Sequence, residues 1–314
     1  MTRGQRCGMM SLTKTRGIFR KMKQEPTQAE LYNKVVRDEN RKETQQIQSR
    51  RENLVVKDNT LIQKSKFHLT ATEQKLVCYV ISLIKPTDKA LDKYTININD
   101  FAQLCGISPK NVYAEFRKMI DDLDNKSVWL TMGDKTFKFR WFSEAEYIEK
   151  QGKVRLMLNS NMKQYLIDLS HSFTQYELYN ILALKSKYSI RLYELFKSYS
   201  YQHTKDFEIE ELKEILGADN YKVYKDFKRR VLDKAIEEIN IYSDLNVEYI
   251  TKAEGSNHKI NKIIFIITRK ESFEGYIAYQ KTIDEINRKN KQVKGQLSLF
   301  DKTEKEFILT YDEG

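Results

Sequence analysis

The chain has 314 residues, 40% of them hydrophobic, which is enough for two modest hydrophobic cores rather than one large core. Its formal net charge of +11 favours an anionic partner such as nucleic acid. The three isolated cysteines and the four widely separated histidines exclude zinc-finger spacing and the paired histidines of a metal-dependent DNA-nicking enzyme.

Other absent patterns narrow the class of protein further. The sequence has no GxxxxGK[ST] loop for nucleotide phosphates, so neither ATPase nor helicase activity is expected of the chain itself. It has no apolar run near the roughly 18 residues that a membrane span needs, and no apolar signal core at its N-terminus. We therefore expect a cytoplasmic protein that is not an enzyme, binds no metal or cofactor and has no membrane partner.

The first 53 residues are basic and poor in large apolar side chains. They carry 13 lysines or arginines against 6 aspartates or glutamates, a net of +7 that leaves only +4 for the rest of the chain. This composition predicts a largely disordered extension with a helix over 28–50. A basic arm that grips phosphates and an upstream start codon, with Met22 as the native start, explain it equally well.

Residues 54–168 have the pattern of a first folded module. Thr70 or Thr72 caps its first helix, and Asn99 caps its second, which ends before Gly106, a residue that allows a tight turn. The predicted elements are a strand over 54–62, a helix over 69–84, a strand over 94–98 and a helix over 100–105.

A longer helix follows, with Ser108 and Pro109 as its cap and first position. The basic residues at its outer face and edges are Lys110, Arg117 and Lys118. Three strands are predicted after it, over 128–131, 136–142 and 154–159. A helix-turn-helix followed by a β-hairpin is a winged helix.

Residues 169–270 repeat this organisation. Within the stretch from Phe207 to Asn240, the part that runs to Ala235 lands without a gap on Ile96 to Asp124 when it is shifted by 111 positions, the separation of Gly217 from Gly106. Two helices are predicted before it, over 173–184 and 186–201, and two strands after it, over 245–251 and 259–268. We therefore predict an α+β protein with tandem winged-helix (helix-turn-helix with β-wing) domains.

The second long helix has an apolar side and a charged side. At about 100° per residue, the side that packs on the domain carries Tyr224, Phe227, Val231, Ala235 and Ile239. The opposite side carries Lys222, Lys225, Asp226, Arg229 and Asp233, and Lys228 lies nearer the apolar side. Recognition helices present such a basic end to base edges, where one arginine can hydrogen-bond two acceptors of a guanine. A solvated charged face is the alternative interpretation.

The loop KAEGSNHK between the last two predicted strands forms the second wing. Lys252 and Lys259, with Lys262 nearby, are placed to meet phosphates or the minor groove. His258 is expected to be a surface residue of this wing.

Five segments in succession now support a family resemblance: LVVKDNTLIQ, LTATEQKLVCYVI, DFAQLCGIS, KSKYSIRLYELF and DFKRRVLDKAIEEIN. Over about Asn53 to Lys270 the chain resembles the iteron-binding plasmid replication initiators of the Rep_3 type. The resemblance implies binding to direct repeats in double-stranded origin DNA as a monomer, opening of the adjacent duplex, and recruitment of host proteins such as the replicative helicase and the host initiator. It also implies dimers, formed mainly through the first module, that repress their own gene.

The resemblance further implies which residues read DNA. The second recognition helix makes the main base contacts, with Arg229 as the best match for a base-reading arginine and Arg230 beside it. Lys222 and Lys225 rest on helix geometry alone. The first recognition helix contacts another part of the repeat, with a larger phosphate share, through Lys110, Arg117 and Lys118. The extension over 1–53 departs from the family's usual start.

A transcriptional repressor without initiator activity is the alternative function, because tandem winged helices do not by themselves specify replication. Several direct repeats of roughly 20 bp, about two helical turns each, beside an A·T-rich tract would indicate an initiator. A lone inverted repeat would favour a repressor.

Residues 271–314 are expected to form a flexible polar tail with one apolar island. This island, Gln296-Leu297-Ser298-Leu299-Phe300, resembles the QL[SD]LF peptide by which bacterial replication and repair proteins dock on the sliding clamp. Gln296 would hydrogen-bond at the pocket edge, while Leu299 and Phe300 would fill an apolar cleft, and Leu297 would also belong to the clamp-binding motif. A short element packed back on the protein, or a chance match, would also explain the pattern.

Overall fold

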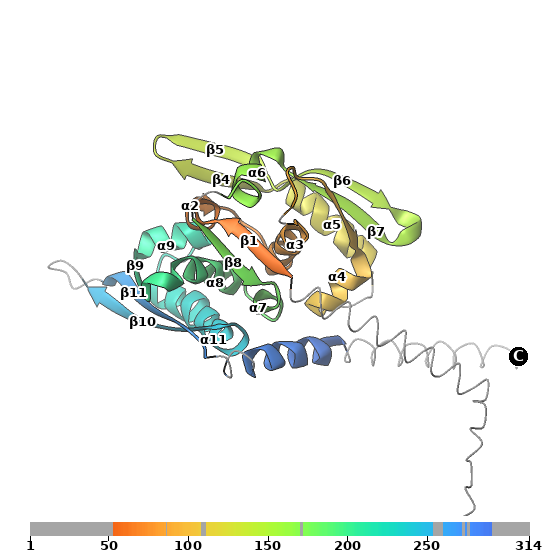
Figure 1. Cartoon of the computed structure of the whole chain (residues 1–314). Coiled ribbons are helices and arrows are strands. Elements are labelled where there is room, and N and C mark those ends of the chain that lie inside the picture. Colours follow the sequence, from red (N-terminus) through yellow and green to blue (C-terminus); the bar gives the residue numbers. More distant parts are fainter. Residues whose placement is uncertain are drawn as a thin grey trace, which may run out of the picture. The chain divides into compact units, whose positions relative to one another are not determined.

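The computed structural model describes residues 53–85, 87–107, 111–169, 172–253, 260–271, 274 and 277–290 of the chain. All of these described residues lie in one unit by their contacts. Within it, the described helices and strands use one arrangement twice, first around α5 and then around α11 (Figure 1).

The first winged helix has three helices and a three-stranded antiparallel sheet in which β7 lies between β3 and β6. Its first helix begins where the sequence predicts because Thr70 and Glu73 form a capping box. The Glu73 backbone N–H donates to Thr70 Oγ1 at 3.3 Å, and the Thr70 backbone N–H donates to Glu73 Oε2 at 2.8 Å. The elements are α3 (Ala71–Ile81), β3 (Lys93–Asn97), α4 (Ile98–Cys105), α5 (Val112–Asp124), β6 (Phe142–Ile148) and β7 (Lys153–Leu158).

The second winged helix has the same topology, with the last strand, β11, between β9 and β10. Its elements are α8 (Lys187–Tyr199), β9 (Thr204–Glu208), α9 (Ile209–Leu216), α10 (Tyr224–Phe227), a π-helical turn (Lys228–Leu232), α11 (Asp233–Tyr242), β10 (Leu245–Ala253) and β11 (Ile260–Arg269). Helices α4 and α9 each have 8 residues and end at the paired glycines, so the predicted repeat and the α+β tandem winged-helix fold are confirmed.

Both turns need glycine for the same reason. Gly106 has φ +63° and Gly217 has φ +61°, the left-handed region in which a Cβ atom is strained. Each glycine donates its backbone N–H back to its own helix, Gly106 to the carbonyl of Gln103 and Gly217 to that of Glu214. The glycines therefore set the angle at which each recognition helix leaves its predecessor.

Further strands join the two modules. An antiparallel pair of β1 (Leu54–Asp58) and β8 (Phe173–Glu177) connects the start of the first module with residues placed by sequence in the second. A separate sheet has the order β2-β4-β5, and its β4–β5 hairpin is prominent in Figure 1. The remaining elements are α2 (Asn59–Lys64), β2 (Ser65–Lys66), β4 (Ser127–Met132), β5 (Lys135–Arg140), α6 (Lys163–Leu166), α7 (Tyr179–Leu182) and 3₁₀ turns over Glu149–Gln151, Ser160–Met162 and Ser200–Gln202.

Two predicted elements are wrong in type. The strand predicted over 54–62 ends at Asp58, whose carboxylate accepts from the Thr60 backbone N–H at 2.7 Å and starts helix α2. The helix predicted over 173–184 is strand β8 followed by the short helix α7. Thr174 and Tyr176 alternate inward along β8, and its partner β1 lies more than a hundred residues earlier, so no local pattern revealed the pairing.

Several predicted boundaries also change. Asn97, not Asn99, caps α4, and its side chain accepts from the backbone N–H groups of Asn99 and Asp100. Helix α5 begins at Val112 after Asn111, later than predicted, while Ser108 and Pro109 lie outside the described residues. Strand β6 was not predicted. The tail predicted as flexible from 271 is helical over 277–290.

A buried ion pair lies where the modules meet. Lys57 of β1 and Glu194 of α8 have side chains 5% and 3% exposed, with Lys57 Nζ 2.5 Å from Glu194 Oε1. Tyr176 of β8 donates its hydroxyl to the same oxygen at 2.5 Å, and Cys78 Sγ of α3 lies 3.3 Å from Lys57 Nζ. Burial alone would raise the pKa of Glu194, but Lys57 overcomes it and holds that pKa below its ordinary value. Four elements are thereby tied together.

Candidate nucleic-acid interface

The second recognition helix packs on its domain through the predicted apolar side. Phe227, Val231, Ala235 and Ile239 are all fully buried, and Tyr224 is partly buried. Leu232 and Ile236 are buried beside them. The helix is therefore fixed on one side, and its other side is presented to solvent.

Two arginines stand on the solvent side of this helix. The side chains of Arg229 and Arg230 are 65% and 59% exposed. Asp226, one turn earlier, lies 3.2 Å from Arg229 Nη2 and 4.0 Å from Arg230 Nε. One carboxylate thus orients both guanidinium groups while leaving most of their N–H donors free. The i, i+3 spacing of Asp226 and Arg229 was visible in the sequence, but Asp226 was not predicted as a site residue.

The helix is irregular where these arginines lie. Lys228–Leu232 forms a π-helical turn between α10 and α11. A π-turn takes one extra residue per hydrogen-bonded ring, and such turns often occur at functional sites. Val231 and Leu232, both within this turn, are fully buried.

Lys228 is engaged within the protein. Its Nζ lies 2.9 Å from both carboxylate oxygens of Asp233, and 5.6 Å from the centre of the Tyr249 ring on β10. Tyr249 donates its hydroxyl to Asp233 at 2.6 Å. Burial alone would raise the pKa of Asp233, but the hydrogen bonds from Tyr249 and Lys228 hold that pKa below its ordinary value. Lys228 therefore links the helix to the wing.

The two remaining lysines of this region differ in position. Lys225 is exposed on α10. Lys222 is also exposed but lies before the helix, which begins at Tyr224 with Val223 as its N-cap, so its predicted place on the helix is wrong.

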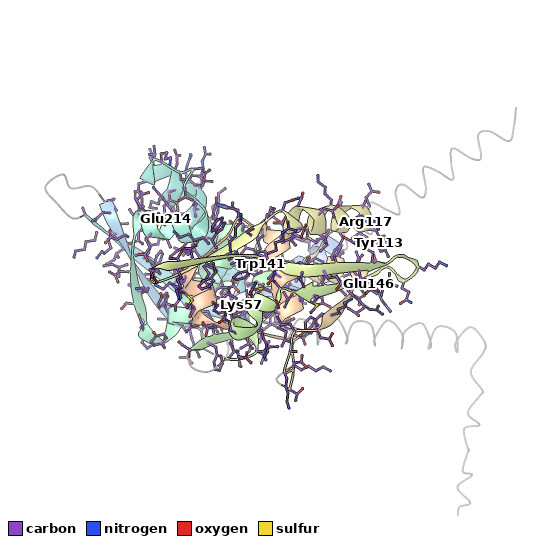
Figure 2. The ribbon with its side chains drawn as sticks, turned by 90° about the horizontal axis from the view of Figure 1, so that it is seen from above. Lys57, Tyr113, Arg117, Trp141, Glu146 and Glu214 are labelled. Carbon is purple, nitrogen blue, oxygen red and sulfur yellow. The ribbon has the colours of Figure 1, made fainter. Side chains whose placement is uncertain are left out.

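In the first module, Arg117 and Lys118 are exposed on α5, whereas Lys110 lies outside the described residues. The Arg117 guanidinium carbon is 4.6 Å from the centre of the Tyr147 ring on β6. Arg117 precedes Lys228 by 111 residues, and β6 and β10 are the first wing strands of their modules, so both modules place a cation over a wing tyrosine. Figure 2 labels Arg117 at the same end of the ribbon as Tyr113 and Glu146.

The second wing is described only in part. Lys252 is exposed on β10, and Lys259 and His258 lie outside the described residues. Lys262, which the sequence placed beside the wing, lies 3.4 Å from both Asp206 and Glu208 of β9. Its ammonium group is therefore paired with carboxylates of the neighbouring strand.

Two further findings hold for the part of the chain that the structure describes. There, no group of three or more His, Cys, Asp or Glu side chains could hold a metal ion, and no helix is long and apolar enough to cross a membrane. The segment Gln296 to Phe300 lies outside the described residues.

Comparisons with known proteins agree with this architecture. The chain is 29% identical over 195 residues to a replication initiation protein of Escherichia coli, a match that covers 58% of the chain and 61% of that protein's length. It is 23% identical over 185 residues to an uncharacterised 27.6 kDa protein of E. coli, covering 57% of the chain and 74% of that protein. The solved structure of the Pi initiator protein in complex with iteron DNA has a TM-score of 0.58 and 23% identity, covering 71% of this chain and 99% of that one.

Two family models match the chain, one after the other. The model described as initiator replication protein, WH1, matches residues 54–197, and the one described as initiator Rep protein, WH2, matches residues 208–267. Proteins of this kind bind DNA and are not enzymes. The chain therefore belongs to the Rep3 family of replication initiator proteins.

Proposed function

We propose that this chain initiates replication of a plasmid by binding direct repeats, or iterons, in the double-stranded DNA of its origin. The observation that carries the proposal is the exposed pair Arg229 and Arg230, held by Asp226 on the free side of the second recognition helix. Guanidinium groups presented in this way match the O6 and N7 acceptors of guanine in the major groove. The similarity to an initiator solved with iteron DNA supports this choice of ligand.

In this proposal the second recognition helix makes the base contacts, and the first makes mainly phosphate contacts. Where the second module has Arg229, the first has Lys118 at the equivalent position, 111 residues earlier. A lysine ammonium has its three donors on one freely rotating nitrogen rather than in the fixed fork of a guanidinium, so we assign mainly phosphate contacts to the first helix. The residues proposed to touch DNA are Lys222, Lys225, Lys228, Arg229 and Arg230 in the second helix region, Lys110, Arg117 and Lys118 in the first, and Lys252 and Lys259 in the second wing.

The test of base reading is the variant Arg229→Ala. Losing one bidentate base contact costs about 1 to 3 kcal/mol of discrimination, or roughly 5- to 150-fold in relative affinity for the base that it reads. Gel-shift titrations against the repeat and its single-base variants should show relaxed specificity at one or two positions. Because the side chain is exposed, the melting temperature should stay within a degree or two of the parent.

Arg140→Ala is the matched control. Arg140 is also an exposed arginine paired with an aspartate, 2.7 Å from Asp124, but it lies on strand β5. Its loss should leave the specificity profile unchanged. If Arg229→Ala kept the full profile of the parent, the proposed base-reading helix would be wrong.

Initiation requires more than binding. We propose that the bound monomer opens the adjacent duplex and recruits host proteins, including the replicative helicase and the host initiator, and that dimers formed mainly through the first module repress the chain's own gene. The gene with its upstream DNA should sustain an otherwise replication-deficient plasmid. A gene product that represses its own promoter but never sustains replication would favour a repressor instead.

The proposal keeps the predicted division of the chain: a basic extension over 1–53, modules over 54–168 and 169–270, and a tail over 271–314. Strand β1 of the first module pairs with β8 of the second, and the first family match runs to residue 197. A chain cut after residue 168 would lose β8 and leave β1 unpaired.

We also propose that Gln296, Leu297, Leu299 and Phe300 bind the sliding clamp of the host polymerase. Two apolar side chains beside a glutamine amide suit a shallow pocket with a polar edge. Replacing Leu299 and Phe300 by alanine should abolish clamp binding in calorimetry and impair plasmid replication, while repeat binding persists. Equal clamp affinities of the parent and this variant would remove the proposal.

A further inference from the structure

The helix over 277–290 follows the second winged helix and is held against it. Its Ala278 and Ile286 are buried, and the Tyr279 ring lies 4.8 Å from that of Tyr179 on α7. Thr282, also buried, donates its hydroxyl to the backbone carbonyl of Tyr242 at 3.0 Å. Tyr242 is the last residue of α11, so this helix is fixed to the end of the second recognition helix.

The far end of the same helix reaches the first module. Asn290 donates its side-chain amide to the backbone carbonyl of Gln103, on α4, at 3.2 Å. The Lys289 side chain covers the glycine turn, because a Cβ atom added to Gly106 would lie 2.8 Å from Lys289 Cδ. Between the two ends, Glu285, only 10% exposed, lies 3.1 Å from Lys185 Nζ. In Figure 1 this blue helix runs from beside α11 towards α4.

The turn at Gly217 in the second module is also covered, in this case by residues of the first module. A Cβ atom added to Gly217 would lie 2.7 Å from His68 Nδ1 and 3.3 Å from the Phe67 carbonyl oxygen, in the segment that leads into the first winged helix. Lys66 of the same segment pairs with Glu214 of α9. Each helix-turn-helix turn is thus covered by a segment that lies outside its own module.

We propose that the helix over 277–290 is a clasp that fixes the spacing between the two recognition helices, and so sets the spacing of contact sites that the protein accepts within one DNA repeat. The inference rests on the proposed function, since it assumes that both helices contact one repeat. One base pair inserted between the two contact regions rotates them by about 35° and separates them by about 3.4 Å. A pair of modules held at both places cannot follow that change. Without the clasp, the modules stay joined only at the junction of β1, β8, α3 and α8, about which the recognition helices can turn.

The test uses the full chain, the variant Ile286→Asp and a chain that ends at residue 276. Ile286 is fully buried, and an unpaired carboxylate there undocks the helix. Ile277→Asp is the matched control, because it makes the same change at a side chain that is 37% exposed in the same helix. Each protein is titrated with the repeat and with repeats carrying one inserted base pair between the contact regions.

The full chain and the control Ile277→Asp should bind the repeat with the inserted base pair at least tenfold more weakly than the original repeat. For Ile286→Asp and the chain that ends at residue 276, the same insertion should weaken binding less than about threefold. Equal discrimination by all four proteins would overturn the inference, as would a full chain that binds both repeats equally. A uniform loss on both DNAs would assign the helix a structural role only and would also overturn it.

A measurement without DNA separates this inference from the proposed function. Spin labels at Lys118→Cys and Lys234→Cys, with Cys7 replaced by serine, report the distance between the recognition helices. A narrow distribution in the full chain that broadens in Ile286→Asp supports the clasp even if the repeat is not bound. Identical distributions would exclude it.

Discussion

The buried pair Lys57 and Glu194 predicts how strongly the junction between the modules depends on charge. At 2.5 Å the gross attraction is about 7 kcal/mol with an effective dielectric constant near 20, against a desolvation penalty of several kcal/mol for each ion. Glu194→Gln leaves Lys57 buried without its counter-ion. We expect this single change to lower the free energy of unfolding by about 3 to 5 kcal/mol.

The double variant Lys57→Met with Glu194→Gln removes both charges of the ion pair while it keeps the packing and the Tyr176 hydrogen bond. The introduced glutamine would keep a carbonyl oxygen to accept the Tyr176 hydroxyl, and methionine fills the volume of the lysine stem without its charge. Most of the lost stability should therefore return. Urea unfolding followed by both circular dichroism and fluorescence provides the measurement, and coincident curves justify a two-state free energy.

The dependence on pH has a definite sign. In the parent, the pKa of Lys57 is raised above 10.5 despite its burial, so its contribution is fully present below pH 10.5 and is lost as the pH rises through the folded-state pKa. In Glu194→Gln, burial without the carboxylate lowers the pKa of Lys57, so the unfolded chain binds more protons and stability rises with pH towards 10.5. A Glu194→Gln variant that costs under about 1 kcal/mol, or a double variant no more stable than it, would refute this reasoning.

Three further outcomes test the turn, the wing and the helix. Gly133→Ala, at φ +60° with open space around it, should cost about 1 to 2 kcal/mol, whereas Gly217→Ala should cost clearly more in the same thermal unfolding assay because its Cβ meets His68. Lys259→Ala should weaken binding to all sequences alike and reduce the slope of log affinity against log salt by about 1. Asp226→Asn should free the two neighbouring arginines and change the preferred base more than the salt slope, as titrations across single-base variants would show.

The sequence predicted most of what local physics controls. The capping pair at Thr70, the left-handed turns at Gly106 and Gly217, and the apolar side through Phe227 each follow from residues within one turn of one another. These signals, together with the 111-residue repeat, were enough to predict the tandem winged-helix fold.

The missed features depend on partners far away in the chain. Strand β8 exists because β1 pairs with it, and the helix over 277–290 because it packs on Tyr179 and Tyr242. The π-turn over Lys228–Leu232 could not be predicted, because a rotation of about 100° per residue describes only a regular α-helix. The pairing of Lys262 with β9 likewise required the register of strands that only the folded sheet provides.

The 111-residue internal repeat gives two winged helices with the same backbone arrangement, for which we propose different contacts with DNA. The cation over the wing tyrosine is kept in both modules, as Arg117 over Tyr147 and as Lys228 over Tyr249, so this position ties the helix to its wing and tolerates either basic side chain. The next position differs, with Lys118 in the first module and an arginine in the second. Since the framework is shared, a difference in DNA reading has to arise from such substitutions and from the π-turn, which has no counterpart in α5. We therefore propose that specificity comes from the exposed residues beside the shared cation, and affinity from the framework that presents them.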